Sequence, residues 1–188
     1  MKNSLPHSIT DNFLERKEFD VIRDFISSDT FPWYYNSVMV QPPLTENELS
    51  PGVFNHLVYN GFESLNHNLH SLLAPTLKQL RVAILTRIKL NLVHKLSKPY
   101  FGTFHLDTPY LKENIASEWK VSILYLNTNN GYTELKNGTR IESVENRLVS
   151  FPSNIEHRVV TQTDTKRRMV INFNYLELKK GDPPLVLS

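Results

Sequence analysis

The chain has 188 residues, of which 40% are hydrophobic and 21% charged, and its formal net charge of +2 is too small to indicate a nucleic-acid or membrane surface. There is no cysteine, so disulfide scaffolds and thiolate metal sites are excluded and any metal must be held by His, Asp or Glu. No apolar run approaches the roughly 20 residues of a membrane span and no signal-peptide pattern is present, so we expect one soluble, intracellular (cytoplasmic) globular domain.

The first half of the chain predicts two helices and several strands. A short strand or lead-in is expected over residues 9–14, and apolar residues at helical spacing predict an amphipathic helix over residues 15–28. Strands predicted over residues 33–40 and 53–59 enclose the proline-rich segment 41–52, which is either a surface loop or a lid. A leucine stripe predicts a helix over residues 65–80, in which Pro75 either kinks the helix or starts a new turn.

From residue 83 onwards the sequence is typical of a β protein. Strand-like segments are predicted at residues 83–93, 100–107, 119–127, 147–151 and 167–178, with turn residues between them. We therefore expect a mainly β protein (α+β) whose N-terminal helices pack on one outer face of a β core. Within the single domain, residues 1–82 are expected to support the core, residues 83–178 to form it and residues 179–188 to be a tail.

The segment YFGTFHLD at residues 100–107 carries the first candidate site. His105 and Asp107 are two residues apart, and such residues point to the same face of a strand. An imidazole and a carboxylate on one face are two members of the 2-His-1-carboxylate set that binds Fe(II). His157 is the best candidate for the third ligand. The His-x-Asp pair alone is a weak signal, because a surface histidine near a turn aspartate gives the same letters.

Further features follow this pair in order along the chain. They are the strand VSILYLN at residues 121–127, the turn at Gly131, the strand RLVSF at residues 147–151, His157, and the pair Arg167-Arg168. Taken singly, each is better explained as a core residue, a loop residue or a solvated cation. Their order and spacing make the signal specific.

This ordered set resembles the Fe(II)/2-oxoglutarate-dependent oxygenases, most closely their prolyl-4-hydroxylase-like branch, over about residues 87–175. The resemblance implies a double-stranded β-helix (jelly-roll) core with helices packed on one sheet. It also implies that His105, Asp107 and His157 bind Fe(II) and are catalytic. 2-Oxoglutarate and O₂ would be consumed in hydroxylating a substrate, with release of succinate and CO₂. Because halogenating relatives lack the carboxylate ligand, Asp107 points to hydroxylation.

The cosubstrate has a distal carboxylate that needs a buried basic partner, and a guanidinium can grip it with two hydrogen bonds. Arg167 and Arg168 compete for this role, because adjacent strand residues face opposite sides. Arg168 shares its face with Val170 and two asparagines, which suit a cofactor pocket, whereas Arg167 shares its face with apolar residues that suit packing beneath the helices. We assign the role to Arg168 and expect Tyr125 to hydrogen-bond the same carboxylate.

Departures from the family pattern leave the substrate open. The strand before the metal pair has no tyrosine where some relatives place a cosubstrate contact, and residues 108–118 match no substrate loop. Asn91 on that strand is a hypothetical pocket residue. The expected substrate is a small molecule or a peptide, such as a prolyl residue. Alternatives are a free amino acid, a small metabolite or a nucleobase, of which the near-neutral charge disfavours the last. A non-enzymatic cupin-like metal-binding module is an alternative of another class.

Overall fold

The computed structural model describes residues 7–39, 51–179 and 181. Its strands are β1 (Ser8–Thr10), β2 (Tyr34–Asn36), β3 (Val53–Asn60), β4 (Glu63–Ser64), β5 (Val82–His94), β6 (Trp119–Tyr125), β7 (Tyr132–Leu135), β8 (Arg140–Glu142), β9 (Leu148–Pro152), β10 (His157–Val160) and β11 (Arg167–Glu177). Its helices are α1 (Arg16–Ser27), α2 (His67–Leu72), α3 (Ala74–Gln79) and α4 (Glu113–Ala116). None of these helices is long and apolar enough to cross a membrane.

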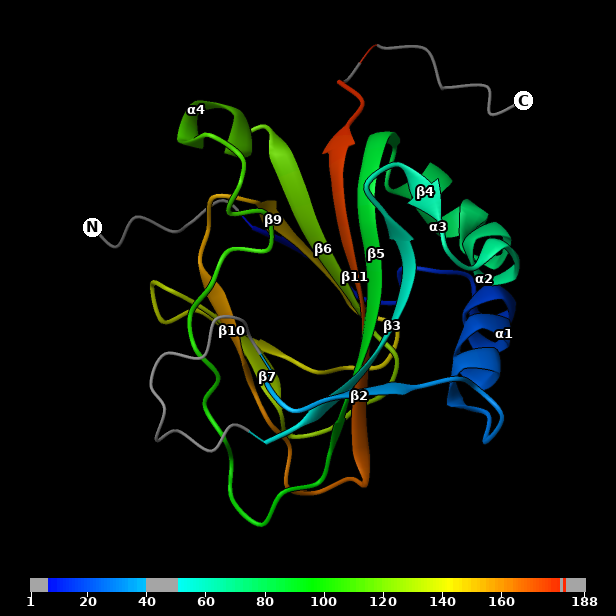
Figure 1. Cartoon of the computed structure of the whole chain (residues 1–188), viewed down its shortest axis with the longest axis vertical. Helices are drawn as coiled ribbons and strands as arrows, with labels where there is room; N and C mark the ends of the chain where they lie inside the picture. The colour runs from blue at the N-terminus through cyan, green and yellow to red at the C-terminus, as the bar shows by residue number, and fades with distance from the viewer. Residues whose placement is uncertain (1–6, 40–50, 180, 182–188) are drawn as a thin grey trace.

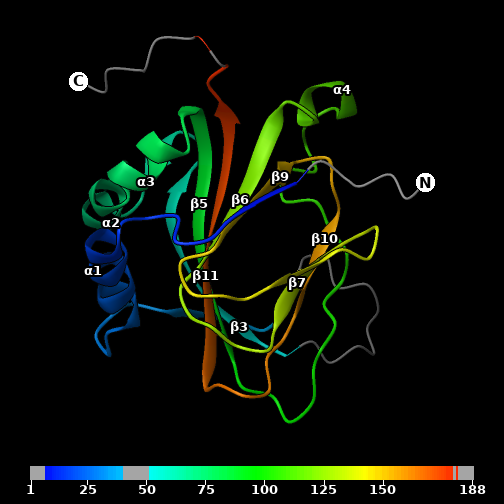
Figure 2. The ribbon, with the colours of Figure 1, turned by 180° about the vertical axis from the view of Figure 1, so that it is seen from behind.

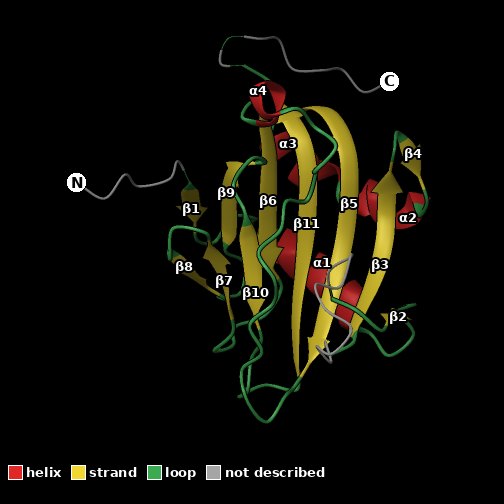
Figure 3. Ribbon diagram, turned by 60° about the vertical axis from the view of Figure 1, so that its left-hand side comes forward, coloured by secondary structure: helices red, strands yellow, loops and turns green. Residues whose placement is uncertain are grey.

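The strands form two antiparallel sheets that lie face to face (Figures 1 and 3). The large sheet has the order β1-β9-β6-β11-β5-β3-β2, with β4 beside β3, and the small sheet has the order β10-β7-β8. The long strands β5 and β11 pair at the centre of this sheet, from Arg167 opposite His94 to Glu177 opposite Val82. Figure 2 shows the layers from behind, with α1, α2 and α3 outside the large sheet and the small sheet across from it. This jelly-roll arrangement confirms the predicted fold class.

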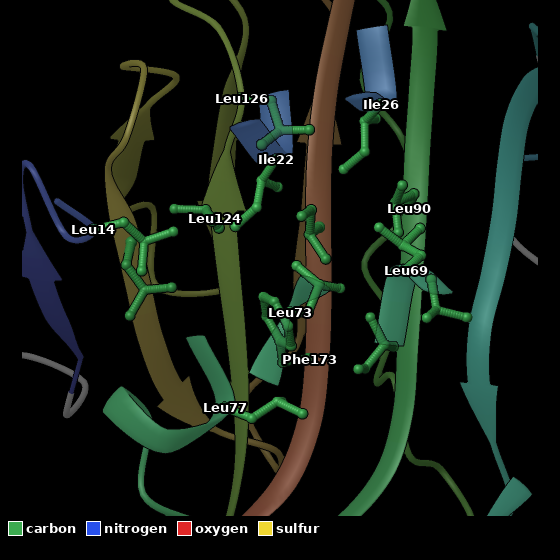
Figure 4. Close-up of a cluster of buried hydrophobic side chains, with 14 of the residues drawn as sticks. Leu14, Ile22, Ile26, Leu69, Leu73, Leu77, Leu90, Leu124, Leu126 and Phe173 are labelled. Atoms are coloured by element: carbon green, nitrogen blue, oxygen red, sulfur yellow. The ribbon is translucent and has the colours of Figure 1, made fainter. Parts of the chain in front are cut away.

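Each face of the large sheet carries its own apolar layer, because successive side chains of a strand point to opposite faces. The outer layer packs the helices on the sheet and includes Phe19, Ile22, Ile26, Leu69, Leu73, Leu77, Ile88, Leu90, Leu124, Leu126, Ile171 and Phe173, of which Figure 4 labels most. The inner layer lies between the sheets and includes Val121, Ile123, Tyr125, Leu135, Val149, Phe151 and Val170. The site described below is on this inner side.

The predicted helix over residues 65–80 consists of two short helices. Pro75 occupies the first turn of α3, where its missing N–H breaks no helical hydrogen bond. It therefore starts a new helix, which was one of the two predicted outcomes. The side-chain oxygen of Asn66 accepts a hydrogen bond from the amide of Leu69 at 3.0 Å and so caps the start of α2.

The prediction of a strand over residues 100–107 is wrong. This segment touches β10 only through isolated bridges, which pair Phe101 with Val160 and His105 with His157. Its aromatic residues favour a strand, but the segment lies at the edge of the small sheet and does not pair continuously with it. Most of the predicted loop or lid at 41–52 and most of the tail at 179–188 lie outside the described residues.

Candidate metal and cosubstrate site

The two sheets enclose a cavity of about 410 Å³. Side chains from β5, β6 and β11 form one wall, and residues 105–109 with β7 and β10 form the other. The polar lining includes Asn55, Arg87, Lys89, Asn91, His105, Asp107, Thr133, His157, Arg168 and Asn172. Asn91 thus faces the pocket, as the sequence suggested.

The structure brings the predicted metal ligands together. Nε2 of His105 lies 3.6 Å from Oδ1 of Asp107, and Nε2 of His157 lies 3.9 Å from the same oxygen. One ligand atom from each residue lies within 4.8 Å of the other two, so a single ion can contact all three. His157 reaches this point because it is the first residue of β10. The role of these residues as Fe(II) ligands stays a prediction.

Hydrogen bonds behind the three residues orient their ligand atoms. Nδ1 of His105 lies 3.0 Å from the carbonyl oxygen of Thr103, and Nδ1 of His157 lies 3.5 Å from that of Ile155. Because a carbonyl only accepts, the proton of each neutral ring belongs on Nδ1, which leaves the Nε2 lone pair free for a metal. Two neutral imidazoles and one carboxylate are a donor set that suits Fe(II).

The carboxylate of Asp107 is oriented as well. Nδ2 of Asn174, on β11, donates a hydrogen bond of 3.0 Å to Oδ2 of Asp107. Oδ1 is the oxygen that lies near the two imidazoles. Strand alternation predicts that this asparagine lies on the pocket face, but nothing in the sequence indicates its contact with Asp107.

Electrostatics favour the ligand state of Asp107 and His157. Burial raises the pKa of Asp107, but the hydrogen bond with His105 and the charges of His157 and Arg87 outweigh it and hold the pKa well below its usual range. Burial lowers the pKa of His157, which keeps this ring neutral. Burial also opposes the charged form of His105, but the interaction with Asp107 raises its pKa overall.

Arg168 lines the same cavity as the three candidate metal ligands, and its side chain is buried, with only 4% of the residue exposed. Its Nε donates to the Ser143 hydroxyl at 2.9 Å, and its Nη2 donates to the Thr133 hydroxyl at 3.2 Å. Tyr125 donates its phenolic hydrogen to the same Thr133 oxygen at 2.7 Å, and its ring centroid lies 5.4 Å from the guanidinium carbon. Among the described residues, no carboxylate pairs with Arg168. A buried cation without an anion is costly, so this corner suits an anionic ligand.

Arg167 and Arg168 lie on opposite faces of β11, as strand alternation predicts. Nη2 of Arg167 donates to the carbonyl oxygen of Ser27, at the end of α1, at 3.0 Å. Its neighbour faces the cavity instead. Thr133 and Ser143, which contact the buried guanidinium, were not predicted from the sequence. The alternation of β7 puts Thr133 inside, but only the pairing of the small sheet places it opposite Arg168.

Solved structures share this fold. An oxidoreductase of the 2OG-Fe(II) oxygenase family from Burkholderia pseudomallei is 12% identical and aligns over 90% of this chain and 84% of its own, with a TM-score of 0.61. A Pseudomonas putida prolyl-4-hydroxylase is 15% identical, with 93% and 94% covered and a TM-score of 0.54. A Trichoplax adhaerens prolyl hydroxylase, in complex with a hypoxia inducible factor peptide fragment, is 17% identical, with 93% and 85% covered and a TM-score of 0.55.

No family model matches the sequence, and no curated protein matches it. At identities this low, the likeness to solved structures shows the fold alone. It confirms that the chain has the fold of the 2OG-Fe(II) oxygenases, prolyl-4-hydroxylases included, which the ordered motifs predicted.

Proposed function

We propose that the protein is an Fe(II)- and 2-oxoglutarate-dependent oxygenase that hydroxylates its substrate, with the whole chain as one catalytic domain. One observation carries this proposal. Two imidazoles and a carboxylate converge at one point of a cavity that also holds a buried arginine without a carboxylate partner. Iron held by His105, Asp107 and His157 supplies the oxidative chemistry, in which 2-oxoglutarate and O₂ become succinate and CO₂ while a substrate C–H bond becomes C–OH.

The chain's own contribution is binding and orientation. Arg168 binds the distal carboxylate of 2-oxoglutarate with charge-assisted hydrogen bonds, which are strong because the guanidinium is buried. The Thr133 hydroxyl, already bonded to Tyr125 and Arg168, lies beside this carboxylate and helps to fix its position. The predicted direct bond from Tyr125 requires its phenol to turn from Thr133 to the cosubstrate. Apolar neighbours such as Val170 and Ile123 limit the access of water to the bound cosubstrate.

Different observations support different classes of substrate. A peptidyl substrate, such as a prolyl residue, is supported by the peptide bound to the Trichoplax prolyl hydroxylase. A free amino acid or another small metabolite is supported by the polar lining of the cavity. A nucleobase substrate is disfavoured by the net charge of +2, since phosphate binding usually needs a basic groove. A cupin-like metal-binding module without activity is the competing function.

Anaerobic titration separates the enzyme from the module. Adding Fe(II) and then 2-oxoglutarate to the metal-free protein should produce a weak visible charge-transfer band, and Fe(II) alone should not. The Asp107→Ala variant should give no band with either addition. If the unaltered protein binds Fe(II) and gives no band with 2-oxoglutarate, the metal-binding module is the better account. A succinate-release assay against prolyl peptides, free amino acids and alkylated oligonucleotides then searches for the substrate.

A further inference from the structure

Two cations that the proposed metal and cosubstrate sites do not use face the same cavity. Arg87 and Lys89 are alternate residues of β5 and therefore share one face of the strand. In the sheet, Lys89 lies opposite Asn172 of β11, and Arg87 lies opposite Asn174. Both side chains line a pocket together with Asp107, so the two cations are beside the metal ligands.

These two cations differ from the others in the lining. Arg158 forms an ion pair with Glu134 at 2.7 Å, and the guanidinium of Arg168 is held by hydroxyl groups. The side chains of Arg87 and Lys89 form no hydrogen bond or ion pair with any other residue in the described part of the chain. Asp107 is the only acid among the described residues that line the cavity, and it is assigned to the metal.

The charge balance of the loaded site leaves both cations unmatched. This step rests on the proposed function. Fe(II) and Arg168 together carry three positive charges, and Asp107 and the 2-oxoglutarate dianion together carry three negative charges. The charges of Arg87 and Lys89 then have no counterpart in the cavity. Two like charges on one face of a strand repel each other, and a bound anion would stabilise both of them.

We propose that Arg87 and Lys89 bind an anionic group of the substrate, a carboxylate or a phosphate, so that the substrate is a small-molecule acid. The Arg87 guanidinium can bind two oxygens of such a group, and the Lys89 ammonium adds a mobile point charge. An internal prolyl residue of a peptide has no such group. The inference therefore favours the small-metabolite alternative over the peptidyl one.

Amide side chains around the two cations suit the rest of a polar small molecule. Asn55 and Asn91 are direct partners across β3 and β5, and both line the cavity with Asn172. The side-chain oxygen of Asn172 is buried and has no hydrogen-bond partner within the described residues. A hydroxyl or ammonium group of the bound acid can donate to this oxygen, which would satisfy it.

Fluorine NMR tests the anion site with two defined probes, trifluoroacetate for a carboxylate and monofluorophosphate for a phosphate. The protein is loaded with Mn(II), a paramagnetic replacement for Fe(II), and with saturating 2-oxoglutarate, so that Arg168 is already occupied. A probe held beside the metal has its fluorine relaxation accelerated. We expect acceleration for one of the probes, and that probe identifies the chemistry of the anion. No acceleration with either probe overturns the proposal.

Variants locate the probe. Lys89→Met and Arg87→Gln should each weaken the acceleration about 10-fold, the effect of removing one charge from a desolvated pair. Lys78→Met, on the exposed side of α3 behind the sheet, should leave it unchanged. If Arg87→Gln does not fold, Lys89→Met alone decides. Full acceleration in Lys89→Met means that the probe binds elsewhere and overturns the proposal.

The same samples separate failure of this inference from failure of the proposed function. Binding of 2-oxoglutarate displaces water from Mn(II), and the proton relaxation rate of the solvent then falls. If that rate falls and no probe responds, the cosubstrate site is present and only the substrate inference is wrong. If that rate does not change, the proposed function fails and this inference fails with it.

Discussion

The backbones of His105 and His157 are joined by two reciprocal hydrogen bonds. The amide of His105 donates to the carbonyl oxygen of His157 at 3.0 Å, and the amide of His157 donates to that of His105 at 3.1 Å. The positions of the two imidazoles are therefore fixed by backbone contacts, and their ring centroids are 4.7 Å apart. Removing a side chain should leave this bridge intact.

Ligand variants should thus lose metal chemistry without losing the fold. His105→Ala and Asp107→Ala are expected to abolish 2-oxoglutarate decarboxylation, because each removes one of the three side chains that would hold the iron. Circular dichroism should remain that of the unaltered protein. Succinate release and equilibrium dialysis with Fe(II) measure the loss. If either variant decarboxylates 2-oxoglutarate as fast as the unaltered protein, the ligands are assigned incorrectly.

The amide of Asn174 should matter through the carboxylate that it orients. Asn174→Ala removes the 3.0 Å hydrogen bond to Oδ2 of Asp107, and we expect the affinity for Fe(II) to fall about 10- to 100-fold. Asn172→Ala is the matched control, since its side chain faces the same cavity and has no bond to Asp107 in the structure. Equal metal affinities in the two variants would contradict an orienting role for Asn174.

The two neighbouring arginines provide a paired test of the cosubstrate site. Arg168→Lys keeps the charge but loses the planar, two-pronged guanidinium, and we expect the Kd of 2-oxoglutarate to rise at least about 10-fold. Arg167→Lys, on the helix-facing side, should leave that Kd unchanged and lower Tm slightly. Anaerobic titration of the charge-transfer band measures both. A larger effect from Arg167→Lys would reverse the assignment.

The sequence predicted the parts of this site that depend on local alternation and on motif order. Arg168 and Arg167 could be placed on opposite faces because β11 is long and alternates regularly. Thr133 and Ser143 could not be found, because their contact with Arg168 depends on the pairing of β7 and β8, strands too short for periodicity to reveal. The segment before Asp107 has residue types that favour a strand, but it has no strand partner along most of its length.

Asn146 should be one of the more important single residues for stability. It adopts a left-handed backbone with φ of 58°, and its side chain bonds both the amide and the carbonyl of Leu14, at 3.0 and 2.8 Å. Asn146→Ala would leave both buried groups unpaired, and we expect the free energy of unfolding to fall by about 2–4 kcal/mol. Denaturant unfolding measures this change.

Asn12 is the matched control for the backbone strain. It is also left-handed, with φ of 51°, and its side chain is exposed and forms no hydrogen bond with the part of the chain that the structure describes. Asn12→Ala should cost about 1 kcal/mol, the strain alone. If the two variants lose equal stability, the bonds to Leu14 contribute nothing and the prediction is wrong.

Lys89 should make the free energy of unfolding depend on pH in the alkaline range. Burial, with a smaller contribution from the charge of Arg87, lowers the pKa of Lys89 to about 8, although Asp107 opposes the shift. In the unfolded chain, a lysine titrates near 10.4. Between these two values the unfolded chain binds more protons than the folded one, so stability rises with pH. Below pH 8 the folded protein carries the full cost of the partly buried ammonium.

Lys89→Met should therefore raise the free energy of unfolding of the metal-free protein at pH 7, and this advantage should shrink as the pH approaches 10. Denaturant unfolding of both proteins at several pH values measures the difference. His105 and Asp107 lie near residue 89 in both proteins, so their own contribution to the pH dependence largely cancels in the comparison. Lys78→Met provides the baseline for an exposed lysine. If the two pH profiles run parallel, Lys89 titrates normally. If Lys89→Met is more stable and no longer binds the fluorinated anion, the chain keeps this partly buried cation to bind its ligand, at the expense of stability.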